Sequence, residues 1–426
     1  MKPFRIAIAG LGTVGGGVAK ALAARGDDLS TRAGRRLEVI AVSARDPKKA
    51  RGFEIKNFAA DPLALASGEA DLVVELIGGE EGVARQLVET ALANGKHVVT
   101  ANKALLAKHG RALAELAEKK DVALKFEAAV AGGIPIVKTL RESLVAYEVQ
   151  AVKGILNGTC NYILTEMEAT GAGFAEVLKE AQKLGYAEAD PTLDVGGGDT
   201  AHKLALLAGL VFGTAPDLAS MTVEGITGIT AADIHFASEF GFRIKLLGVA
   251  RRTANGVEQK VSPSMVRARS PLANVDGAQN GVMVDAGAAG PFFFSGRGAG
   301  EAPTASAVIS DIVEAAAGAF RPAFGRPAAQ LATLAPAPPG ASVSPWYLRF
   351  EVLDVPGVLA SIAGSLSGAG VSIESMIQRG RNPGEGVAIV MITHEAPQSA
   401  VERALNAIAA SDKVRARPCM IPMEAA

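Results

Sequence analysis

The chain has 426 residues, of which 49% are apolar. A chain of this length exceeds one ordinary hydrophobic core, so we expect roughly two to four domains. Its 43 Lys and Arg residues nearly balance its 44 Asp and Glu residues, which gives a net charge of -1. This balance argues against a nucleic-acid-binding surface and against an acidic tail. The expected partners are therefore small molecules and other copies of the chain.

Cysteine content and hydropathy indicate the cellular compartment in which we expect the protein. The two cysteines, Cys160 and Cys419, show no paired metal-ligand spacing, so we expect neither a disulfide framework nor a structural zinc site. The apolar run at the N-terminus ends in glycines and is too short for a secretion signal. No run reaches the about 18 apolar residues that a membrane-spanning helix needs. These features favour a protein of the reducing cytoplasm with no membrane partner.

The first part of the chain alternates between β-like runs and helical spacing. The β-like runs are residues 4–9, 37–43, 71–77 and 97–101. Strands that alternate with helices at this interval predict an α/β fold with a Rossmann-like, doubly wound parallel sheet. We assign this nucleotide-binding domain to residues 1–134.

A later helical stretch is expected to return to this first domain. Residues 304–319 carry an apolar stripe of Val308, Ile309, Ile312 and Val313. Because such a stripe must be buried, we expect residues 304–325 to pack back on the nucleotide-binding domain.

The pattern changes from about residue 135. Helical runs occur at 174–184 and 199–213, and strand-like runs occur at 243–252 and 258–266. This mixture predicts an α+β domain over residues 135–303, which we expect to carry the substrate and to pair with another subunit.

The last third of the chain begins with a segment rich in proline, alanine and serine. Residues 326–345 have no apolar period, which is typical of a linker. Residues 346–426 then follow a strand, helix, strand, strand, helix order, with a further short strand expected at 413–419. This order predicts a small third domain.

A glycine-rich turn joins the first strand to the first helix and matches G-x-G-x-x-G. The first glycine permits a tight turn, the second lets a pyrophosphate approach the backbone, and the third lets helix and strand pack closely. The helix N-terminus adds free N–H groups and a partial positive charge. We therefore predict dinucleotide binding here, rather than a purely structural turn. The residues concerned are Gly10, Gly12, Thr13, Val14 and Gly15.

The end of the second strand bears on the choice of cofactor. It reads Ser43-Ala44-Arg45-Asp46, with no carboxylate at the strand tip, where an NAD site holds the ribose hydroxyls. Ser43 and Arg45 suit a 2′-phosphate instead, because guanidinium donates to phosphate in a planar fork. NADP is therefore favoured over NAD. The alternative is a solvated Arg45, with Asp46 reaching back to the ribose.

Two lysines and an aspartate form the candidate catalytic group. Thr100 and Lys103 lie at the carboxyl edge of the sheet, where doubly wound folds bind ligands, although Lys103 also suits an exposed helix start. Asp199 begins a helix after three glycines, and Lys203 lies one turn further on, so the two side chains share a face. The helix start and the leucines that follow disfavour the lysine cation, whereas Asp199 favours it. A lysine in this balance is suited to proton exchange.

Three further carboxylates precede the glycines: Glu188, Asp190 and Asp194. Carboxylates without a histidine metal-ligand pattern suit the binding of an ammonium group. A divalent metal site and a solvated acidic loop remain the alternatives. Neither Asp190 nor His202 receives a role from this pattern.

Six segments in this order resemble homoserine dehydrogenase: GLGTVGGGV, TANKALLA, FEAAVAGGIPIV, KGILNGTCNYIL, LGYAEADPTLDVGGGDTAHKL and GRGAGEAPTASAV. The final region resembles a ferredoxin-like ACT domain. The resemblance covers nearly the whole chain. It implies a reversible, NAD(P)-dependent reduction of L-aspartate 4-semialdehyde to L-homoserine, on the route to threonine, methionine and isoleucine.

The resemblance also implies roles for single residues. Lys203 matches the proton donor of aldehyde reduction, and Lys103 matches a lysine that contacts cofactor and substrate. Asp199 matches a further active-site acid that also borders the substrate. Gly300 matches a segment that returns to the cofactor.

For the substrate amino group, the resemblance implies Glu188 and Asp194, with a main-chain contact at Gly185.

Two other functions are alternatives to a homoserine dehydrogenase. A nonenzymatic amino-acid sensor would need only the nucleotide-binding and ACT domains, and it would have no use for a proton donor such as Lys203. A different NAD(P)-dependent amino-acid or hydroxy-acid dehydrogenase is the second alternative.

FEAAVAGGIPIV matches a loop that binds a monovalent cation in this family. The implied ligands are the carboxylate of Glu127 and the main-chain oxygens of Val130, Gly132 and Ile134. One carboxylate with several carbonyl oxygens suits a hard cation of low charge, which we expect to be Na⁺. The same residues would also suit a loop that binds no ion.

Within the C-terminal region, Asp354-Val355-Pro356-Gly357 turns into a helix, and Gly370 precedes the second strand. This arrangement resembles the ACT ligand loop. It implies feedback by threonine, pairing of subunits, or both, with a purely assembling domain as the alternative. We expect a homodimer or a homotetramer.

Overall fold

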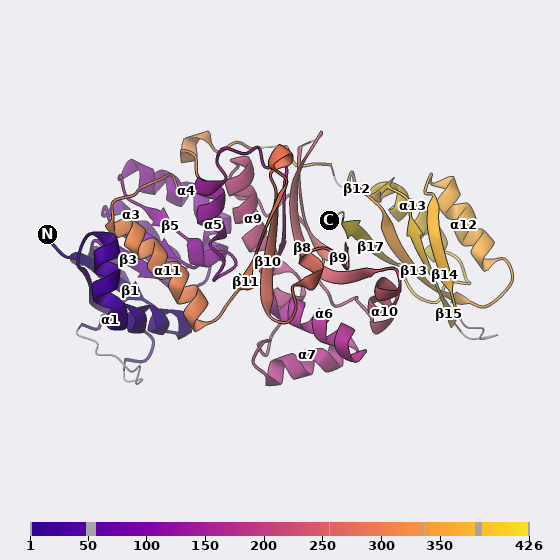
Figure 1. Cartoon of the computed structure of the whole chain (residues 1–426), viewed down its shortest axis with the longest axis horizontal. Helices are drawn as coiled ribbons and strands as arrows, with labels where there is room; N and C mark the ends of the chain where they lie inside the picture. The colour runs from indigo at the N-terminus through magenta and orange to yellow at the C-terminus, as the bar shows by residue number, and fades with distance from the viewer. Residues whose placement is uncertain are drawn as a thin grey trace.

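The computed structural model describes residues 2–47, 57–254, 256–333, 335–338, 340–379 and 386–424. Figure 1 shows three bodies in a row: an N-terminal α/β unit, a central unit of long strands, and a C-terminal unit. None of the described helices is both long and apolar enough to cross a membrane.

The N-terminal unit confirms the predicted doubly wound parallel sheet. Its strand order is β2-β1-β3-β4-β5, and all pairs are parallel. The strands are β1 (Phe4–Ala9), β2 (Leu37–Ser43), β3 (Leu72–Glu75), β4 (His97–Thr100) and β5 (Leu124–Lys125). The helices are α1 (Thr13–Ala33), α2 (Leu63–Ser67), α3 (Val83–Ala93) and α4 (Lys103–Lys119). Their apolar faces bury both sides of the sheet, which explains the alternation seen in the sequence.

Helix α11 (Glu301–Ala316) packs on this first unit although it follows the central strands (Figure 1). Val308 and Ile312 are fully buried in one apolar cluster with residues of β1 and α1. A Cβ placed on Gly17 of α1 would lie 2.7 Å from Cγ of Glu301, so the two helices approach closely only because Gly17 has no side chain.

The central unit is an antiparallel sheet in the order β11-β10-β6-β8-β9. Its strands are β6 (Ala151–Ile155), β8 (Phe242–Thr253), β9 (Gly256–Arg267), β10 (Gln279–Asp285) and β11 (Pro291–Arg297), and the short β7 (Thr222–Val223) pairs with β9. Its helices are α5 (Ile136–Lys138), α6 (Gly158–Thr170), α7 (Phe174–Lys183), α8 (Thr192–Val195), α9 (Gly198–Phe212) and α10 (Ala231–Glu239). Three leucines of α9 are fully buried, which explains the apolar run after Lys203.

The C-terminal unit has the predicted order of an ACT domain. It comprises β13 (Trp346–Leu353), α12 (Val358–Gly368), β14 (Ile373–Gln378), β15 (Gly386–Thr393) and α13 (Gln398–Ala409), and a two-stranded sheet pairs β12 (Val343–Ser344) with β16 (Ala396–Pro397). The final strand is β17 (Cys419–Glu424), so the strand expected at 413–419 was placed too early. The turn before it occupies most of the predicted range.

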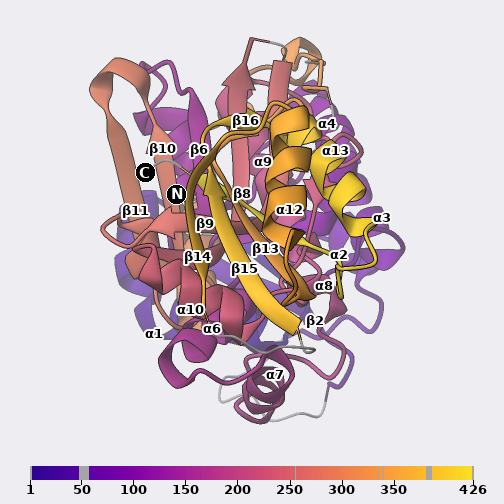
Figure 2. The same ribbon diagram turned by 90° about the vertical axis from the view of Figure 1, so that its right-hand side faces the viewer.

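Strand β17 makes the central and C-terminal sheets continuous. It pairs antiparallel with β13 and parallel with β9, where Met423 lies opposite Met265. Figure 2 views the chain from this end, with α12, α13 and the strands of the ACT sheet nearest the viewer. A buried ion pair crosses the same junction, since Arg349 Nε of β13 lies 2.7 Å from Asp233 Oδ1 of α10.

The segment 326–345 follows the surface of the central unit instead of leaving it. Ala332 N donates to Gly213 O at 2.9 Å, and Ala337 N donates to Val257 O at 3.1 Å. These main-chain hydrogen bonds hold the described part of the segment beside the central unit.

Candidate functional site

The glycine-rich turn between β1 and α1 has the geometry of a phosphate cradle. Gly10 has φ +100°, and a Cβ placed on it would lie 2.5 Å from Leu76 O. A Cβ on Gly15 would lie 1.9 Å from Gly10 O. By contrast, a Cβ on Gly12 would meet nothing within 4 Å, so the backbone is open to a ligand there.

The start of α1 completes this cradle. Gly12 is its N-cap and provides no side-chain hydrogen bond, and Thr13 is exposed while Val14 is half-buried in the first turn. Uncapped N–H groups at a helix N-terminus attract anions. The residues therefore fit the pyrophosphate of a dinucleotide cofactor.

The end of β2 lies beside this turn. Ser43 is buried, and its carbonyl accepts a hydrogen bond from Gly10 N at 2.9 Å, so Ser43 belongs to the scaffold of the turn. Arg45 is exposed and forms no ion pair with a described residue. Its guanidinium is therefore available to an anion next to the cradle.

Thr100 shapes the carboxyl edge of the sheet. It is fully buried, and its hydroxyl donates to Glu75 Oε2 at 2.6 Å. The Thr100 hydroxyl oxygen also accepts a hydrogen bond from Asn102 N at 2.9 Å. Asn102 then caps α4, because its Oδ1 accepts from Leu105 N at 3.1 Å. This chain of hydrogen bonds fixes Lys103 at the first position of α4. The part played by Glu75 was not predicted, although a lone carboxylate at the end of a buried strand was a visible signal.

Asp199 lies between the two lysines predicted to be catalytic. Its Oδ2 is 2.8 Å from Lys203 Nζ, and its Oδ1 is 3.1 Å from Lys103 Nζ. Burial alone would raise the pKa of Asp199, but the charges of Lys203 and Lys103 outweigh burial and hold it well below its usual range. Lys203 also donates to Leu156 O at 2.6 Å. The structure thus brings both lysines and this carboxylate to one point.

Asn157 connects Asp199 with Asp194, a role that the sequence interpretation missed. Its Nδ2 donates to Asp194 Oδ1 at 2.7 Å and to Asp199 Oδ2 at 2.8 Å. Its Oδ1 caps α6 by accepting from Cys160 N at 2.8 Å. The dipeptide Asn-Gly before a helical run was a cap signal. That the opposite end of the same amide would meet two acids was not visible in it.

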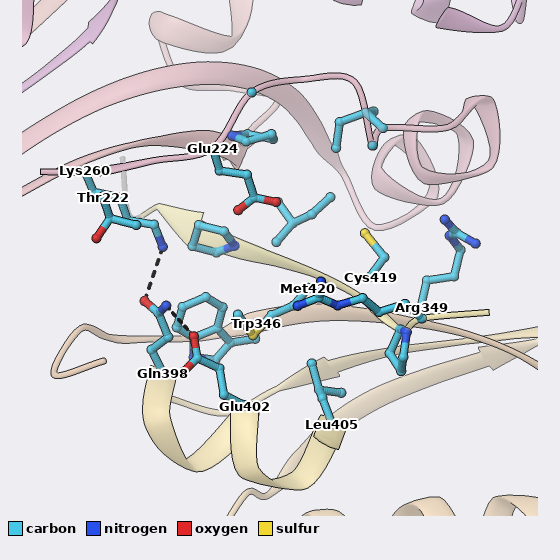
Figure 3. Close-up of a pocket in the computed structure, with 18 of the residues that line it drawn as sticks. Thr222, Glu224, Lys260, Trp346, Arg349, Gln398, Glu402, Leu405, Cys419 and Met420 are labelled. Carbon is cyan, nitrogen blue, oxygen red and sulfur yellow. Dashed lines mark hydrogen bonds between the residues drawn. The ribbon is translucent and has the colours of Figure 1, made fainter. Parts of the chain in front are cut away.

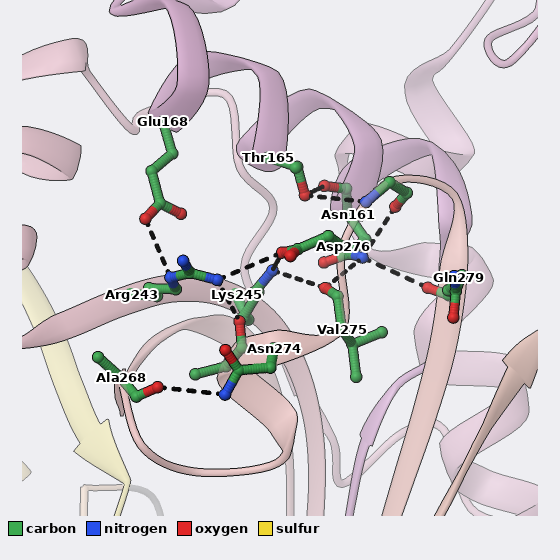
Figure 4. Close-up of polar contacts among 12 residues, drawn as sticks. Asn161, Thr165, Glu168, Arg243, Lys245, Ala268, Asn274, Val275, Asp276 and Gln279 are labelled. Carbon is green, nitrogen blue, oxygen red and sulfur yellow. Dashed lines mark hydrogen bonds and ion pairs between the residues drawn. The ribbon is translucent and has the colours of Figure 1, made fainter.

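Helix α6 is anchored at a second polar cluster, shown in Figure 4. Asn161 Nδ2 donates to the carbonyls of Val275 and Gly277 at 2.9 and 2.8 Å, and Lys245 Nζ donates to Val275 O at 2.7 Å. Arg243 pairs with Glu168 at 3.0 Å. These contacts hold the helix whose first turn positions Asn157.

Asp194 differs from Asp199 in its electrostatics. Burial and then the nearby charge of Asp199 raise its pKa, against the hydrogen bond from Asn157. A partly buried carboxylate that lacks a cation of its own is a suitable partner for a ligand ammonium group.

The other carboxylates of this loop lie apart from the cluster. Glu188 and Gly185 are exposed, and the Glu188 carboxylate has no partner within the part of the chain that the structure describes. Asp190 forms a local turn before α8, because its Oδ1 accepts from Thr192 N and Oγ1 at 3.1 and 2.6 Å. His202 is half-buried beside Lys103, its Nδ1 has no hydrogen-bond partner, and burial and then Lys103 lower its pKa.

Glu127 begins the short segment η1 (Glu127–Ala129) under helix α11. Its carboxylate oxygens accept from Val137 N at 2.9 Å and Lys138 N at 2.8 Å. Burial and then the charge of Asp311 raise the pKa of Glu127 to about 7. Burial likewise raises the pKa of Asp311, to about 6, so the ionised forms of these two carboxyls are disfavoured although Arg141 acts in the opposite direction.

The loop after Glu127 touches the segment before α11. Val130 is buried, Ile134 O accepts from Ile136 N at 2.7 Å, and Gly132 has φ +45°. A Cβ on Gly132 would lie 2.3 Å from Gly298 O. Gly300, with φ +118°, then starts α11 beside α1. No group of three or more acidic, histidine or cysteine side chains in the described residues could hold a metal ion.

A nucleotide cradle whose sheet edge ends at a buried group of lysines and carboxylates defines an NAD(P)-dependent oxidoreductase. Comparison with protein families agrees in each part of the chain. A model described as "Homoserine dehydrogenase, NAD binding domain" matches residues 10–127, "Homoserine dehydrogenase" matches 135–313, and "ACT domain" matches 346–410.

The chain belongs to the homoserine dehydrogenase family. The homoserine dehydrogenase of Neisseria gonorrhoeae is 45% identical, over 100% of this chain and 99% of its own length. A homoserine dehydrogenase structure from Thiobacillus denitrificans superposes with a TM-score of 0.94 at 44% identity, covering 100% of this chain and 99% of that one. A hyperthermophilic archaeal homoserine dehydrogenase in complex with NADPH has a TM-score of 0.63 and 26% identity, covering 74% of this chain and 98% of its own.

Proposed function

We propose that this chain reduces L-aspartate 4-semialdehyde to L-homoserine reversibly. The observation that carries the proposal is the convergence of Lys103 and Lys203 on Asp199 at the carboxyl edge of the nucleotide-binding sheet. When bound in the Gly12 cradle, the nicotinamide dinucleotide supplies the hydride that reduces the aldehyde carbon.

Lys203 is the proposed proton donor. Its ammonium is oriented by the Leu156 carbonyl and by Asp199, which leaves the third N–H bond for the substrate oxygen. Lys103 is less buried and pairs with the other oxygen of Asp199. Its positive charge is proposed to stabilise the negative charge that develops on the substrate oxygen during reduction. In the reverse direction, Lys203 accepts the hydroxyl proton.

The amino group of the substrate is proposed to bind at Asp194 and Asp199. The raised pKa of Asp194 supports this, because a ligand ammonium would supply the cation that this carboxyl lacks. Glu188 and Gly185 join the proposal through the family resemblance. Both lie on the exposed loop that leads into α8.

We propose NADP as the preferred cofactor, with NAD as the weaker alternative. Exposed Arg45 at the end of β2 supports a contact with a 2′-phosphate. The archaeal relative in complex with NADPH supports the same choice. Gly300 is proposed to border the cofactor, since α11 packs on α1.

A monovalent cation, Na⁺, is proposed at the Glu127 loop. The raised pKa values of Glu127 and Asp311 support it, because a cation would favour carboxylates that burial disfavours, and the main-chain oxygens of Val130, Gly132 and Ile134 are the proposed carbonyl ligands. A cation there would favour the ionised form of Glu127.

The ACT unit is proposed to bind threonine at the turn Asp354–Gly357 and to regulate activity. The parallel pairing of β17 with β9 supports communication with the central unit. We also propose a homodimer or homotetramer in the cytoplasm, and domain limits of 1–134, 135–303, 326–345 and 346–426.

One assay tests the activity. The purified full chain is mixed with NADPH and L-aspartate 4-semialdehyde, cofactor oxidation is followed by absorbance, and the product is identified by chromatography. The proposal expects homoserine in equal amount to the NADPH oxidised. An amino-acid sensor would give no turnover, and a different dehydrogenase would oxidise NADPH only with another carbonyl compound.

A further inference from the structure

Asn280 of β10 carries a buried amide without a hydrogen-bond partner. The residue is 1% exposed, and neither its Oδ1 nor its Nδ2 forms a hydrogen bond with any residue that the structure describes. A polar atom that loses water without gaining a partner costs free energy, so most buried polar atoms in folded proteins are paired. Exceptions concentrate at functional sites. The unpaired amide of Asn280 therefore points to a functional role.

The cavity between the central unit and the ACT unit does not provide that role. Its volume is about 790 Å³, and Figure 3 shows Glu224 and Lys260 facing it from one side and Gln398 from the other. Within the described parts of the chain, its wall includes no residue of β10 or β11. A ligand in this cavity would therefore not meet the Asn280 amide.

Strand pairing places Asn280 between the substrate side and the cofactor side of the central unit. Strand β10 pairs with β6 up to Ile155, so Asn280 lies level with Leu156, the next residue of that chain segment. The Leu156 carbonyl accepts a hydrogen bond from Lys203 at 2.6 Å. On its other side, Asn280 pairs with Gly296 of β11. It thus lies between the segment that orients the proposed proton donor and the strand that leads back to the cradle.

The Asn280 amide lies directly against the main chain of Gly298. A Cβ placed on Gly298 would lie 1.5 Å from Asn280 Oδ1 and 2.8 Å from its Nδ2, so only glycine leaves room for this contact. Both amide atoms are thus close to the main chain that follows β11, although neither bonds to it. A small shift of this main chain would let Oδ1 accept from an N–H group and Nδ2 donate to a carbonyl group.

Residues 298–300 link the central sheet to α11. At one end of this link, Arg297 pairs with β10. At the other end, Gly300 has φ +118° and precedes α11, which packs on α1. The first residue of α11, Glu301, also pairs with Lys20 of α1 at 3.0 Å. Because both ends are held, the conformation of these three residues decides how Gly300 lies relative to the cofactor cradle.

We propose that Asn280 is a positioning residue for the dinucleotide. Its amide forms hydrogen bonds with the main chain of residues 298–300 when the dinucleotide is bound, and it thereby holds Gly300 against the cofactor. Binding and pairing then favour each other, because the paired arrangement satisfies an amide that is otherwise buried without a partner. This inference rests on the proposed binding of NADP.

Two variants remove the amide in different ways. Asn280→Leu replaces it with an apolar group of similar size, and Asn280→Ala removes it without crowding Gly298. We expect the Kd for NADPH, measured by nicotinamide fluorescence, to rise about tenfold in each variant, because hydrogen bonds of the bound state are lost. With NADPH at saturation, kcat and the KM for the aldehyde should stay near those of the parent chain.

The thermal midpoint of unfolding separates this role from a merely structural one. Replacing a residue that only supports the fold would lower the midpoint. Without added NADPH, Asn280→Leu should instead unfold at the temperature of the parent chain or above it, because the variant no longer buries an unpaired amide. Added NADPH should raise the midpoint of the variant less than that of the parent, because the variant binds it more weakly.

Ser270→Ala is the matched control. Ser270 is 3% exposed, and its hydroxyl likewise has no hydrogen-bond partner in the described ranges, but it lies in the turn after β9, outside the link to α11. This variant should be at least as stable as the parent and should bind NADPH with the same Kd.

Hydrogen exchange reports on the pairing itself. NADPH should protect the main-chain N–H groups of residues 298–300 more in the parent chain than in Asn280→Ala, and equal protection would overturn the inference. It is also overturned if both Asn280 variants bind NADPH as tightly as the parent, or if Asn280→Leu fails to fold, since the amide would then support the fold itself. A parent chain that does not bind NADPH would refute the proposed cofactor, whereas equal binding by parent and variants refutes the positioning role alone.

Discussion

The carboxylate of Asp199 lies 3.1 Å from the ammonium of Lys103, although the two residues belong to different units of the fold. Lys103 begins α4, just after β4 of the nucleotide-binding sheet, whereas Asp199 lies in α9, the buried helix of the central unit. Their ion pair places the chemistry where the two units meet. The proposed cofactor site on one unit therefore lies beside the proposed substrate site on the other.

Replacing Asp199 with Asn should remove the negative charge between the two lysines while keeping the size of the side chain. We expect turnover to fall by about 10²- to 10⁴-fold, because the proton donor loses its orienting partner. The free energy of unfolding should fall by about 3 kcal/mol, because two lysines lose a largely buried counter-charge. Steady-state kinetics and urea unfolding measure both. Asp27→Asn, at an exposed position of α1, is the control, and equal losses in both variants would contradict the role.

Asn157→Ala should affect the substrate more than the cofactor. The amide bridges Asp194 and Asp199, so its loss should raise the KM for the aldehyde by about tenfold and leave the KM for NADPH unchanged. Asn274→Ala serves for comparison, because Asn274 bonds only main-chain carbonyls of its own loop. An unchanged aldehyde KM in Asn157→Ala would exclude the bridge from substrate binding.

Arg45→Ala should alter cofactor choice. We expect kcat/KM with NADPH to fall by about tenfold and kcat/KM with NADH to stay the same, since only NADPH carries the 2′-phosphate. Arg25→Ala, which removes another exposed arginine of the same unit, should change neither value. A parallel loss with both cofactors would show that Arg45 does not read the phosphate.

The Glu127 loop should make stability depend on pH and on Na⁺. The pKa of Glu127 rises from 4.5 to about 7 on folding, so the folded state binds this proton more tightly. Its contribution to stability is therefore present in acid and is lost as the pH rises through about 7. Na⁺ at the loop should reduce that loss.

Thermal unfolding between pH 5 and pH 8, in NaCl and in tetramethylammonium chloride of equal ionic strength, tests this expectation at roughly the two ends of the titration. The Glu127→Gln variant should remove the pH dependence of this group. Identical curves for the parent chain in the two salts would argue against a cation at the loop.

Local patterns predicted those parts of the chain whose structure depends on near neighbours. The G-x-G-x-x-G turn and the strand-helix alternation predicted the parallel sheet, because both are local patterns; the close approach of Gly15 to Gly10 O, for example, lies within one turn. Asp199 and Lys203 were paired correctly, since one helical turn fixes their distance.

Contacts between distant segments were not predictable in this way. The meeting of Lys103 with Asp199 depends on how α4 lies beside α9. Asn157 was recognised in the sequence only as part of a motif, because its second function requires α6 to lie beside the glycine bend. Strand β17 was placed too early, since its partners β13 and β9 belong to different units.

The most direct test of the account is the turnover of Lys203→Ala with NADPH and L-aspartate 4-semialdehyde, measured beside the binding constant for NADPH. The account predicts a fall in kcat of about 10²-fold or more, because the proton donor is lost, with NADPH bound as tightly as by the parent chain. Near-normal turnover in this variant would contradict the assignment of Lys203 as the proton donor.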